Sequence, residues 1–136
     1  MDILKSIMVA ASGLKAQSGR MRVIAENLAN ADSTATKPGG DPYRRKIPVF
    51  KSMLDRELGA RTVELDKIAR DRSDFGTRLE PGHPAADENG YVKTPNVNAL
   101  IETMDMREAQ RSYEANLNVI SATRRMVMRT LDILRV

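Results

Sequence analysis

Apolar and small side chains recur every three or four residues at both ends of the chain, and this spacing predicts two long helices. Steps of four and three keep such positions on one helical face, as in a heptad repeat. Asp2 is a candidate N-cap, and the small polar run 30–34 is typical of a helix end. The first stripe comprises Ile3, Ile7, Ala10, Leu14, Gln17, Met21, Ile24, Leu28 and Ala31.

The C-terminal segment repeats this pattern. Its helix begins either after Thr94, with Pro95 in the first turn, or after Asn98, four residues before Glu102. Both alternatives are open, and both predict a helix that runs to the chain end. The second stripe comprises Met106, Gln110, Tyr113, Leu117, Ile120, Arg124, Val127, Leu131 and Leu134.

The middle of the chain lacks helical periodicity. Residues 37–42 form a turn cluster, Tyr43–Phe50 alternates as in a short edge strand, Thr62–Asp66 alternates similarly, and Asp71–Asn89 is a polar connector. Apart from the alternation at 62–66, no pattern predicts the fold of residues 51–74. We therefore expect a mainly α protein in which two terminal helices pair as a coiled-coil-like bundle around a small β-hairpin and loop element.

One structural unit is expected, divided into an N-terminal helix (1–31), a loop and small β element (32–94) and a C-terminal helix (95–136). Gly13 and Gly19 each cost about 1 kcal/mol inside a helix. They indicate either close approach of another backbone or simple tolerance.

Apolar side chains are spread around the C-terminal helix beyond its stripe. A helix that is apolar on several sides needs several neighbours. With only 4% aromatic residues to anchor a core, the sequence predicts an elongated, assembly-dependent protein. The additional apolar positions are Leu100, Ile101, Met104, Val119, Met126, Met128 and Ile133.

Composition excludes several classes of protein. The chain has no cysteine, which excludes disulfide frameworks, thiolate metal sites and thiol catalysis. Its longest uncharged runs, Ser6–Leu14 and Ala115–Thr123, are far shorter than the roughly 20 residues that span a bilayer. Asp2 and the broken apolar run after it do not fit a secretory signal, so any export is expected to use another route.

Neither the charge distribution nor any motif predicts a ligand or a reaction. The net charge of +4 is spread along the chain, so a nucleic-acid partner is not expected. His83 is the only histidine and lacks a second nitrogen ligand, and no phosphate loop or nucleophile elbow occurs. We expect no enzyme activity, no cofactor and no metal. Four arginines near the end of the second helix suit the helix macrodipole and do not by themselves indicate a binding patch: Arg124, Arg125, Arg129 and Arg135.

Asparagines cluster in or beside the two predicted helices. Asparagine disfavours helix interiors, but it caps helix ends and, when buried, fixes register. Two roles are therefore open for these asparagines: capping of helix ends with exposure to solvent, or buried contacts that set the register. The residues are Asn27, Asn30, Asn96, Asn98, Asn116 and Asn118.

An N-terminal signature and four later motifs, in order along the chain, resemble those of the bacterial flagellar rod, hook and hook-associated protein family. The segment 25–34 (AENLANADST) is similar to its N-terminal signature. The short length and the later motifs resemble its proximal-rod members, and the likeness covers essentially the whole chain, with 51–74 the least distinctive stretch. Those motifs are Pro42–Lys46 (PYRRK), His83–Asp87 (HPAAD) with Gly90–Val92, Pro95–Asn98 (PNVN) and Arg111–Asn116 (RSYEAN).

The resemblance implies a structural subunit of the flagellar basal body. Such a subunit is exported without cleavage by the flagellar type III apparatus and polymerises helically into the periplasm-crossing rod, which transmits motor torque to the hook. Implied partners are further copies of the chain, other proximal-rod proteins, the distal rod, the rod–ring junction protein FliE and the export apparatus. The alternative is a cytosolic coiled-coil adaptor or basic regulatory protein.

Candidate assembly residues follow from the two stripes and the asparagines. They are Ile7, Leu14, Met21, Ile24, Asn27, Leu28, Asn30, Asn96, Asn98, Tyr113, Asn116, Leu117, Ile120, Val127, Leu131 and Leu134.

Overall fold

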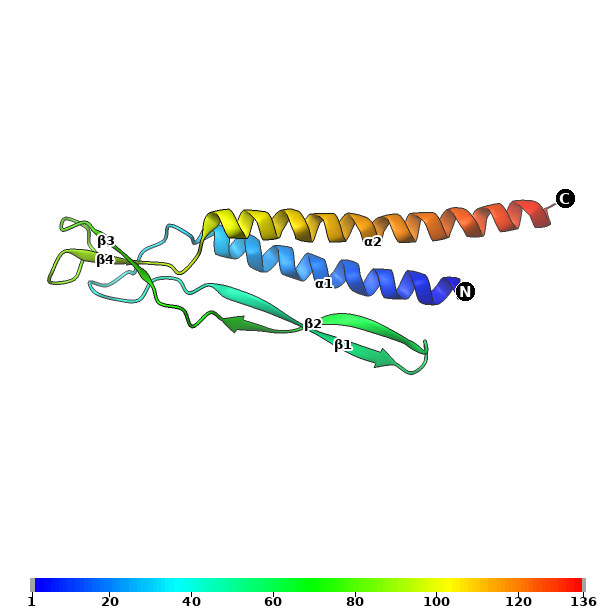
Figure 1. The fold of residues 1–136 in the computed structure, drawn as a ribbon, viewed down its shortest axis with the longest axis horizontal. Coiled ribbons are helices and arrows are strands. Elements are labelled where there is room, and N and C mark those ends of the chain that lie inside the picture. The colour runs from blue at the N-terminus through cyan, green and yellow to red at the C-terminus, as the bar shows by residue number, and fades with distance from the viewer. Residues whose placement is uncertain (1, 136) are drawn as a thin grey trace. The chain divides into compact units, whose positions relative to one another are not determined.

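The computed structural model describes residues 2–135 and contains two helices separated by four strands (Figure 1). The helices span 27 and 36 residues, less than half of the chain, so the prediction of a mainly α protein holds only in part. The predicted small β-hairpin is in fact two antiparallel pairs, β1–β2 and β3–β4. The elements are α1 (Ile3–Ala29), β1 (Lys46–Asp55), β2 (Ala60–Arg70), β3 (Gly76–Leu79), β4 (Tyr91–Thr94) and α2 (Ala99–Leu134).

Contacts divide the chain into two compact units. Unit 1 holds the chain up to Met21, the segment Val49–Lys67 and the chain from Arg107 onward. Unit 2 holds Arg22–Pro48 and Ile68–Met106. Both helices and both long strands contribute residues to each unit, so each unit is described by itself.

Asparagine and aspartate side chains begin both helices. The Asp2 carboxylate accepts hydrogen bonds from the backbone N–H groups of Leu4 (3.1 Å) and Lys5 (3.4 Å), which confirms it as the N-cap of α1. Asn98 caps α2 in the same way, through Leu100 (3.0 Å) and Ile101 (3.3 Å). The second helix therefore begins after Asn98 rather than after the alternative cap Thr94, which ends β4.

Small side chains bring the two helices of unit 1 close together. Ala10, Gly13 and Ala16 are buried, and a Cβ built on Gly13 would lie 2.8 Å from the side-chain amide of Asn116. Arg20 pairs with Glu108 at 3.5 Å. Because the later residue of α1 contacts an earlier residue of α2 than Gly13 does, the two helices are antiparallel here.

The glycines of α1 therefore permit close contact, but the contacting group is a side chain. Gly13 faces Asn116, and Gly19 faces the Leu65 side chain, whose nearest atom would lie 3.1 Å from an added Cβ. Of the two alternatives left open for these glycines, close approach is supported, with a side chain as the nearest group. The physical reason is the same as expected, since only a residue without Cβ leaves room for the facing side chain.

The β1–β2 hairpin is longer than the sequence pattern predicts. The first strand covers Lys46–Asp55 rather than Tyr43–Phe50, and the second covers Ala60–Arg70 rather than Thr62–Asp66. In unit 1 this hairpin packs on α1, where the Ser12 hydroxyl accepts a hydrogen bond from the Val63 backbone N–H at 3.3 Å. Gly59, with φ of 58°, provides the left-handed residue of the turn.

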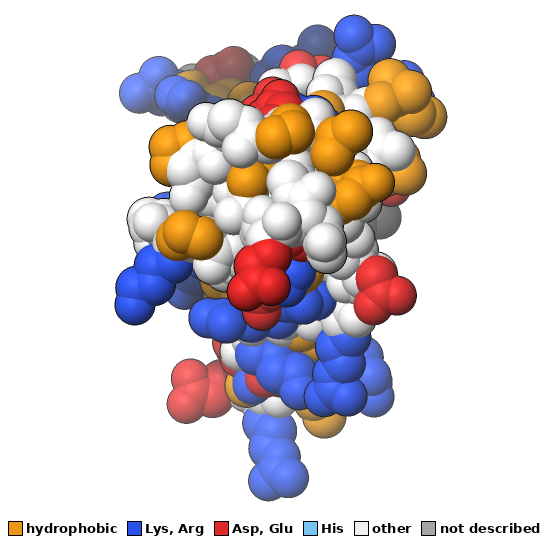
Figure 2. Space-filling view, turned by 90° about the vertical axis from the view of Figure 1, so that its left-hand side faces the viewer, with side chains coloured by type: hydrophobic (Ala, Val, Ile, Leu, Met, Phe, Trp, Pro, Cys, Tyr) orange, Lys and Arg blue, Asp and Glu red, His pale blue; other side chains and the backbone are white. Residues whose placement is uncertain are grey.

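Unit 2 contains the second antiparallel pair, whose first strand β3 lies within the segment Asp71–Asn89 that the sequence predicts as a polar connector. Strand β3 pairs with β4 in the register Gly76 to Thr94 and Leu79 to Tyr91. Val92 of β4 is fully buried and forms part of a small apolar core. On the face drawn in Figure 2, hydrophobic side chains lie in separate groups, with backbone and other side chains between them.

Candidate functional site: a buried polar network

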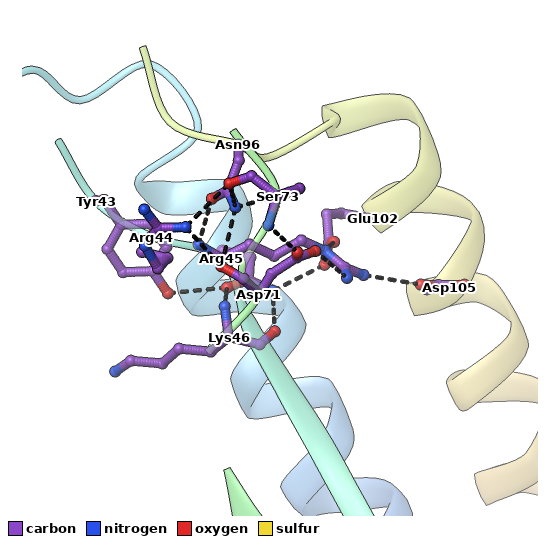
Figure 3. A network of polar contacts seen from close by, with 10 residues as sticks. Tyr43, Arg44, Arg45, Lys46, Asp71, Ser73, Asn96, Glu102 and Asp105 are labelled. Atoms are coloured by element: carbon purple, nitrogen blue, oxygen red, sulfur yellow. Dashed lines mark hydrogen bonds and ion pairs between the residues drawn. The ribbon is translucent and has the colours of Figure 1, made fainter. Parts of the chain in front are cut away.

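Asn27, in the last turn of α1, is only 1% exposed and uses its whole side-chain amide within unit 2 (Figure 3). Its Nδ2 donates to the backbone carbonyl of Lys46 at 2.8 Å and to the Glu102 carboxylate at 3.1 Å. Its Oδ1 accepts from the Lys46 backbone N–H at 2.9 Å and from the Tyr43 hydroxyl at 2.8 Å. The amide thus joins the end of α1 to the start of β1 and of α2.

Glu102, in the first turn of α2, is also 1% exposed, and it needs a cation because an unpaired buried carboxylate is very costly. Arg45 provides that cation through its Nε. The same guanidinium reaches Asp71 at 3.4 Å and Asp105 at 3.8 Å. Burial by itself would lower the pKa of Arg45, but the ion pairs with Glu102 and Asp71 raise it.

Asn96, between β4 and α2, extends the network to the loop after β2. Its Oδ1 accepts from the Arg45 backbone N–H at 2.8 Å. Its Nδ2 donates to the Asp71 carbonyl at 3.2 Å and to the Ser73 hydroxyl at 3.0 Å. The Ser73 N–H and hydroxyl lower the pKa of Asp71, and Arg45 lowers it further, so Asp71 remains an anion beside the guanidinium.

Tyr43, just before β1, is a further member of the network. Burial raises the pKa of its hydroxyl to about 12, and the negative charges of Glu26 and Glu102 contribute to the increase. The hydroxyl therefore stays protonated and serves as a donor to Asn27. The Arg44 guanidinium donates to the Asp71 carbonyl at 2.8 Å. We call the whole set the Asn27 network: Asn27 together with the residues labelled in Figure 3, which are Tyr43, Arg44, Arg45, Lys46, Asp71, Ser73, Asn96, Glu102 and Asp105.

The arrangement is suited to holding unit 2 together rather than to a reaction. The Asn27 amide has all of its hydrogen bonds, and the buried carboxylate of Glu102 is neutralised by Arg45. Among the residues described, no group of three or more His, Cys, Asp and Glu side chains lies in a position to hold a metal ion. His83 accepts a hydrogen bond from the Ala85 backbone N–H at 3.0 Å within its own turn.

The candidate assembly residues fall into three groups by exposure. Ile24 and Asn27 are buried, and Asn98, Leu117, Leu131 and Leu134 are exposed. Half-buried are Ile7, Leu14, Met21, Leu28, Asn30, Asn96, Tyr113, Asn116, Ile120 and Val127.

Several of the asparagines bond within the chain. Asn27 and Asn96 belong to the network, and Asn98 caps α2. Asn30 and Asn116 bond to carbonyls four residues earlier, those of Glu26 and Ser112. The role of these residues in contacts between subunits stays a prediction.

Sequence reasoning missed Arg45, Glu102 and Asp71 as members of a site. Glu102 lies four residues before Met106 and so falls on the apolar stripe of α2, where a charged side chain was a usable signal. Its partner Arg45 is 57 residues away in the sequence, and no local pattern connects the two.

Two family models match the chain at its helical ends. The model described as "Flagella basal body rod protein" matches residues 7–35. The model described as "Flagellar basal body rod FlgEFG protein C-terminal" matches residues 88–133. These two segments contain most of both helices, together with β4, so the fold and the matches define the class of flagellar basal-body rod proteins.

Curated relatives narrow this class. The chain is 55% identical over 127 residues to the flagellar basal-body rod protein FlgC of Agrobacterium fabrum, covering 93% of this chain and 91% of that one. It is 42% identical to FlgC of Salmonella typhimurium, with 98% of each chain covered. It is 39% identical to FlgC of Bacillus subtilis, with 98% and 99% covered. The chain belongs to the FlgC family of flagellar basal-body rod proteins.

Proposed function

We propose that this rod subunit assembles through apolar surface that its two terminal helices leave uncovered. The family is structural, and the chain is a structural component of the flagellar basal body and not an enzyme. The alternative, a cytosolic adaptor or basic regulator, has no support from the relatives.

The observation that carries the proposal is the far end of α2 in unit 1. Gly13 lies opposite Asn116 and Arg20 lies opposite Glu108, so by continuation Ile3 lies opposite a residue near position 126. Helix α2 continues to Leu134, about two turns past the start of α1. The last turns of α2 therefore extend beyond the start of α1.

These turns of α2 carry large exposed apolar side chains. Leu131 is 52% exposed and Leu134 is 75% exposed, and both continue the stripe that includes Val127. Exposed apolar side chains that follow one another on a helix face are typical of a surface that a partner covers. A neighbouring helix that covers Leu131 and Leu134 explains why the stripe continues to the end of the helix.

Similar exposed apolar side chains occur elsewhere on both helices. They include Ile3, Leu4, Met8 and Val9 on α1 and Leu100, Ile101, Met104, Leu117, Val119, Met126 and Ile133 on α2. Each large apolar side chain that becomes buried contributes about 1.5–3 kcal/mol. The terminal segments 1–31 and 95–136 thus form the assembly core in this proposal, and segment 32–94 is a smaller middle element.

The finer features of the proposal rest on the family. Coiled-coil pairing with neighbouring helices, helical polymerisation and transmission of torque across the periplasm follow from a rod made of such subunits. The partners are further copies, other rod proteins, the junction protein FliE and the type III export apparatus, which passes the chain uncleaved. No helix among the described residues is long and apolar enough to cross a membrane.

Isolated basal bodies provide the direct test. Mass spectrometry of purified hook–basal bodies is expected to find this chain with residues 1–20 intact, because α1 is part of the assembly core. Absence of the chain from basal bodies, with recovery in the cytosol, would contradict the proposal. Recovery of a chain that lacks residues 1–20 would contradict export without cleavage.

A further inference from the structure

Asn89 is followed by Gly90 in the loop between β3 and β4, and it is the only one of the seven asparagines in the chain that precedes a glycine. Glycine has no Cβ to hinder attack by its own backbone nitrogen on the side-chain carbonyl carbon of the asparagine before it. An Asn–Gly pair therefore offers the least steric resistance to deamidation. The pair is a candidate site of covalent modification.

The side chain of Asn89 is open to this reaction. Asn89 is exposed, and its side-chain amide makes no hydrogen bond with another residue in the described part of the chain, 2–135. The residue borders an open hollow of about 440 Å³ that Pro38, Gly39, Asp87 and Glu88 also line. Water therefore reaches the amide carbon, which is the atom that would be attacked.

The nitrogen that would attack is in the opposite situation. Gly90 is buried, and its backbone N–H donates a hydrogen bond to the Asp87 carbonyl at 3.0 Å. Its own carbonyl accepts a hydrogen bond from the Glu80 N–H at 2.9 Å, so both sides of the residue are fixed. A buried, hydrogen-bonded N–H reacts only after the structure around it opens. The folded loop therefore withholds the nucleophile.

Asp87 holds this part of the loop with both its side chain and its backbone. Its Oδ1 accepts hydrogen bonds from the backbone N–H groups of Asn89 and Tyr91, each at 2.9 Å. Its own N–H donates to the Tyr91 carbonyl at 2.9 Å. Aspartate commonly closes turns by accepting from an N–H two residues further on. We call residues 87–91 the Asp87 turn, in which Asp87 is the positioning residue.

The Asp87 turn also explains why glycine stands at position 90. Gly90 has a φ of 83°, a conformation that residues with a side chain rarely adopt. A Cβ on this residue would lie 3.1 Å from the Pro81 ring. The fold therefore requires the same glycine that makes Asn89 reactive, and protection has to come from the hydrogen bonds of the turn.

We propose that Asn89–Gly90 is a latent deamidation site, which the Asp87 turn keeps unreactive in the folded chain and which reacts when the turn opens. In the open state the Gly90 nitrogen loses its proton to solvent base and bonds to Cγ of Asn89, and the side-chain nitrogen leaves as ammonia. Water then adds to one of the two carbonyl groups of the five-membered imide. The ring opens to aspartate or isoaspartate at position 89. This inference is independent of the proposed function.

The two products have different effects on the fold. Aspartate keeps the backbone unchanged and adds one negative charge next to Glu88. In isoaspartate the backbone passes through the side-chain carbon, so the segment between Asp87 and Tyr91 becomes longer by one atom. The hydrogen bonds that connect Asp87 to Tyr91 then no longer fit. Because Tyr91 pairs with Leu79, isoaspartate should disrupt this end of the β3–β4 pair.

Incubation of the full-length chain in mildly alkaline buffer, with and without urea, tests the proposal. Trypsin releases residues 79–93 as one peptide, in which Asn89 is the only asparagine. Mass spectrometry measures the conversion of its amide to a carboxylate, and an isoaspartyl methyltransferase assay measures isoaspartate. We expect Asn89 to deamidate at least about tenfold more slowly in the folded chain than in urea.

Two substitutions at Asp87 test its positioning role. Asp87→Ala removes the acceptor for the N–H groups of Asn89 and Tyr91, and the folded variant should deamidate at Asn89 several times faster than the unmodified chain. Asp87→Asn keeps a side-chain oxygen as acceptor and should stay as slow as the unmodified chain. In urea all three chains should react at similar rates, since no turn is left to protect Asn89. Fragment spectra assign the change to position 89, and circular dichroism melting verifies the fold.

Hydrogen exchange of the Gly90 amide, followed by NMR in the unmodified chain, provides a measurement that requires no variant to fold. Slow exchange is expected. Four results would overturn the proposal: equal deamidation with and without urea, no deamidation in urea, no acceleration in folded Asp87→Ala, and exchange of the Gly90 amide at the rate of an unstructured peptide. An isoaspartate-containing chain that melts at the same temperature as Asn89→Asp would contradict the effect on the β3–β4 pair.

Discussion

The side-chain amide of Asn27 donates a 3.1 Å hydrogen bond to the carboxylate of Glu102, although the two residues are 75 positions apart in the sequence. Both side chains are fully buried, so neither can turn to water if the other is removed. The pair thus makes the end of α1 and the beginning of α2 depend on each other within unit 2.

Replacing Asn27 by Leu should destabilise the protein strongly. The change leaves the Lys46 backbone groups and the Tyr43 hydroxyl without their Asn27 partner and removes one hydrogen bond of Glu102, and each buried group left unpaired costs about 1–3 kcal/mol. We expect urea unfolding to show a loss of about 3 kcal/mol or more. Asn30→Leu is the control and should cost about 1 kcal/mol or less, because the Asn30 amide bonds only the Glu26 carbonyl of its own helix. Equal effects of the two changes would show that Asn27 is not a register-setting residue.

The buried ion pair of Arg45 and Glu102 should respond unequally to loss of either partner. Arg45→Met leaves a fully buried carboxylate without its cation and is expected to cost about 3–5 kcal/mol. Glu102→Met should cost less, because Arg45 is partly exposed and keeps Asp71 and Asp105. The double variant should cost less than the sum of the two, as a double-mutant cycle by urea unfolding measures. Equal and additive costs would contradict this assignment.

Alkaline pH should weaken unit 2 through Tyr43. The pKa of this hydroxyl is raised to about 12 in the folded protein, against about 10 in an unfolded chain. Between these two pH values the folded state therefore binds more protons than the unfolded state. The stabilisation that the protonated Tyr43 hydroxyl provides is complete below pH 10 and is lost as pH rises towards 12. Tyr43→Phe is expected to make the free energy of unfolding less dependent on pH in this window. An unchanged slope would show that Tyr43 does not carry the effect.

The two helices were predictable from the sequence because their stripes and N-caps are local signals. Asp2 and Asn98 lie within three residues of the N–H groups that they cap. The length of β1 was not predictable, since residues 51–54 are all exposed and show no alternation between a buried and a solvent face. The Asn27 network escaped prediction for a different reason: its ion pairs and hydrogen bonds connect segments that only the tertiary fold brings together.

Gly13 should tolerate alanine only if Asn116 is shortened as well. An added Cβ would lie 2.8 Å from the Asn116 amide, which is itself bonded to the Ser112 carbonyl, so something must move. We expect Gly13→Ala to destabilise the chain by about 1–3 kcal/mol. In an Asn116→Ala background the same change should stabilise it by about 1 kcal/mol, because alanine is the better helix former. Thermal or urea unfolding of the four variants tests this, and a stabilising effect of Gly13→Ala alone would refute the close contact.

The claim that the uncovered end of α2 builds the rod is tested most directly by Leu131→Asp/Leu134→Asp. These two side chains are exposed within the chain, so their replacement should leave folding of the subunit intact. In the rod each of them contributes about 1.5–3 kcal/mol per contact, and a carboxylate in its place faces apolar surface. Quantification of the chain in purified basal bodies, with swimming assays, should show that the double variant is exported but not incorporated and that the cells are non-motile. The control Arg56→Ala/Arg61→Ala should be incorporated normally. A complete rod and normal motility with the double Asp variant would contradict the account and require that α2 present another face to its neighbours.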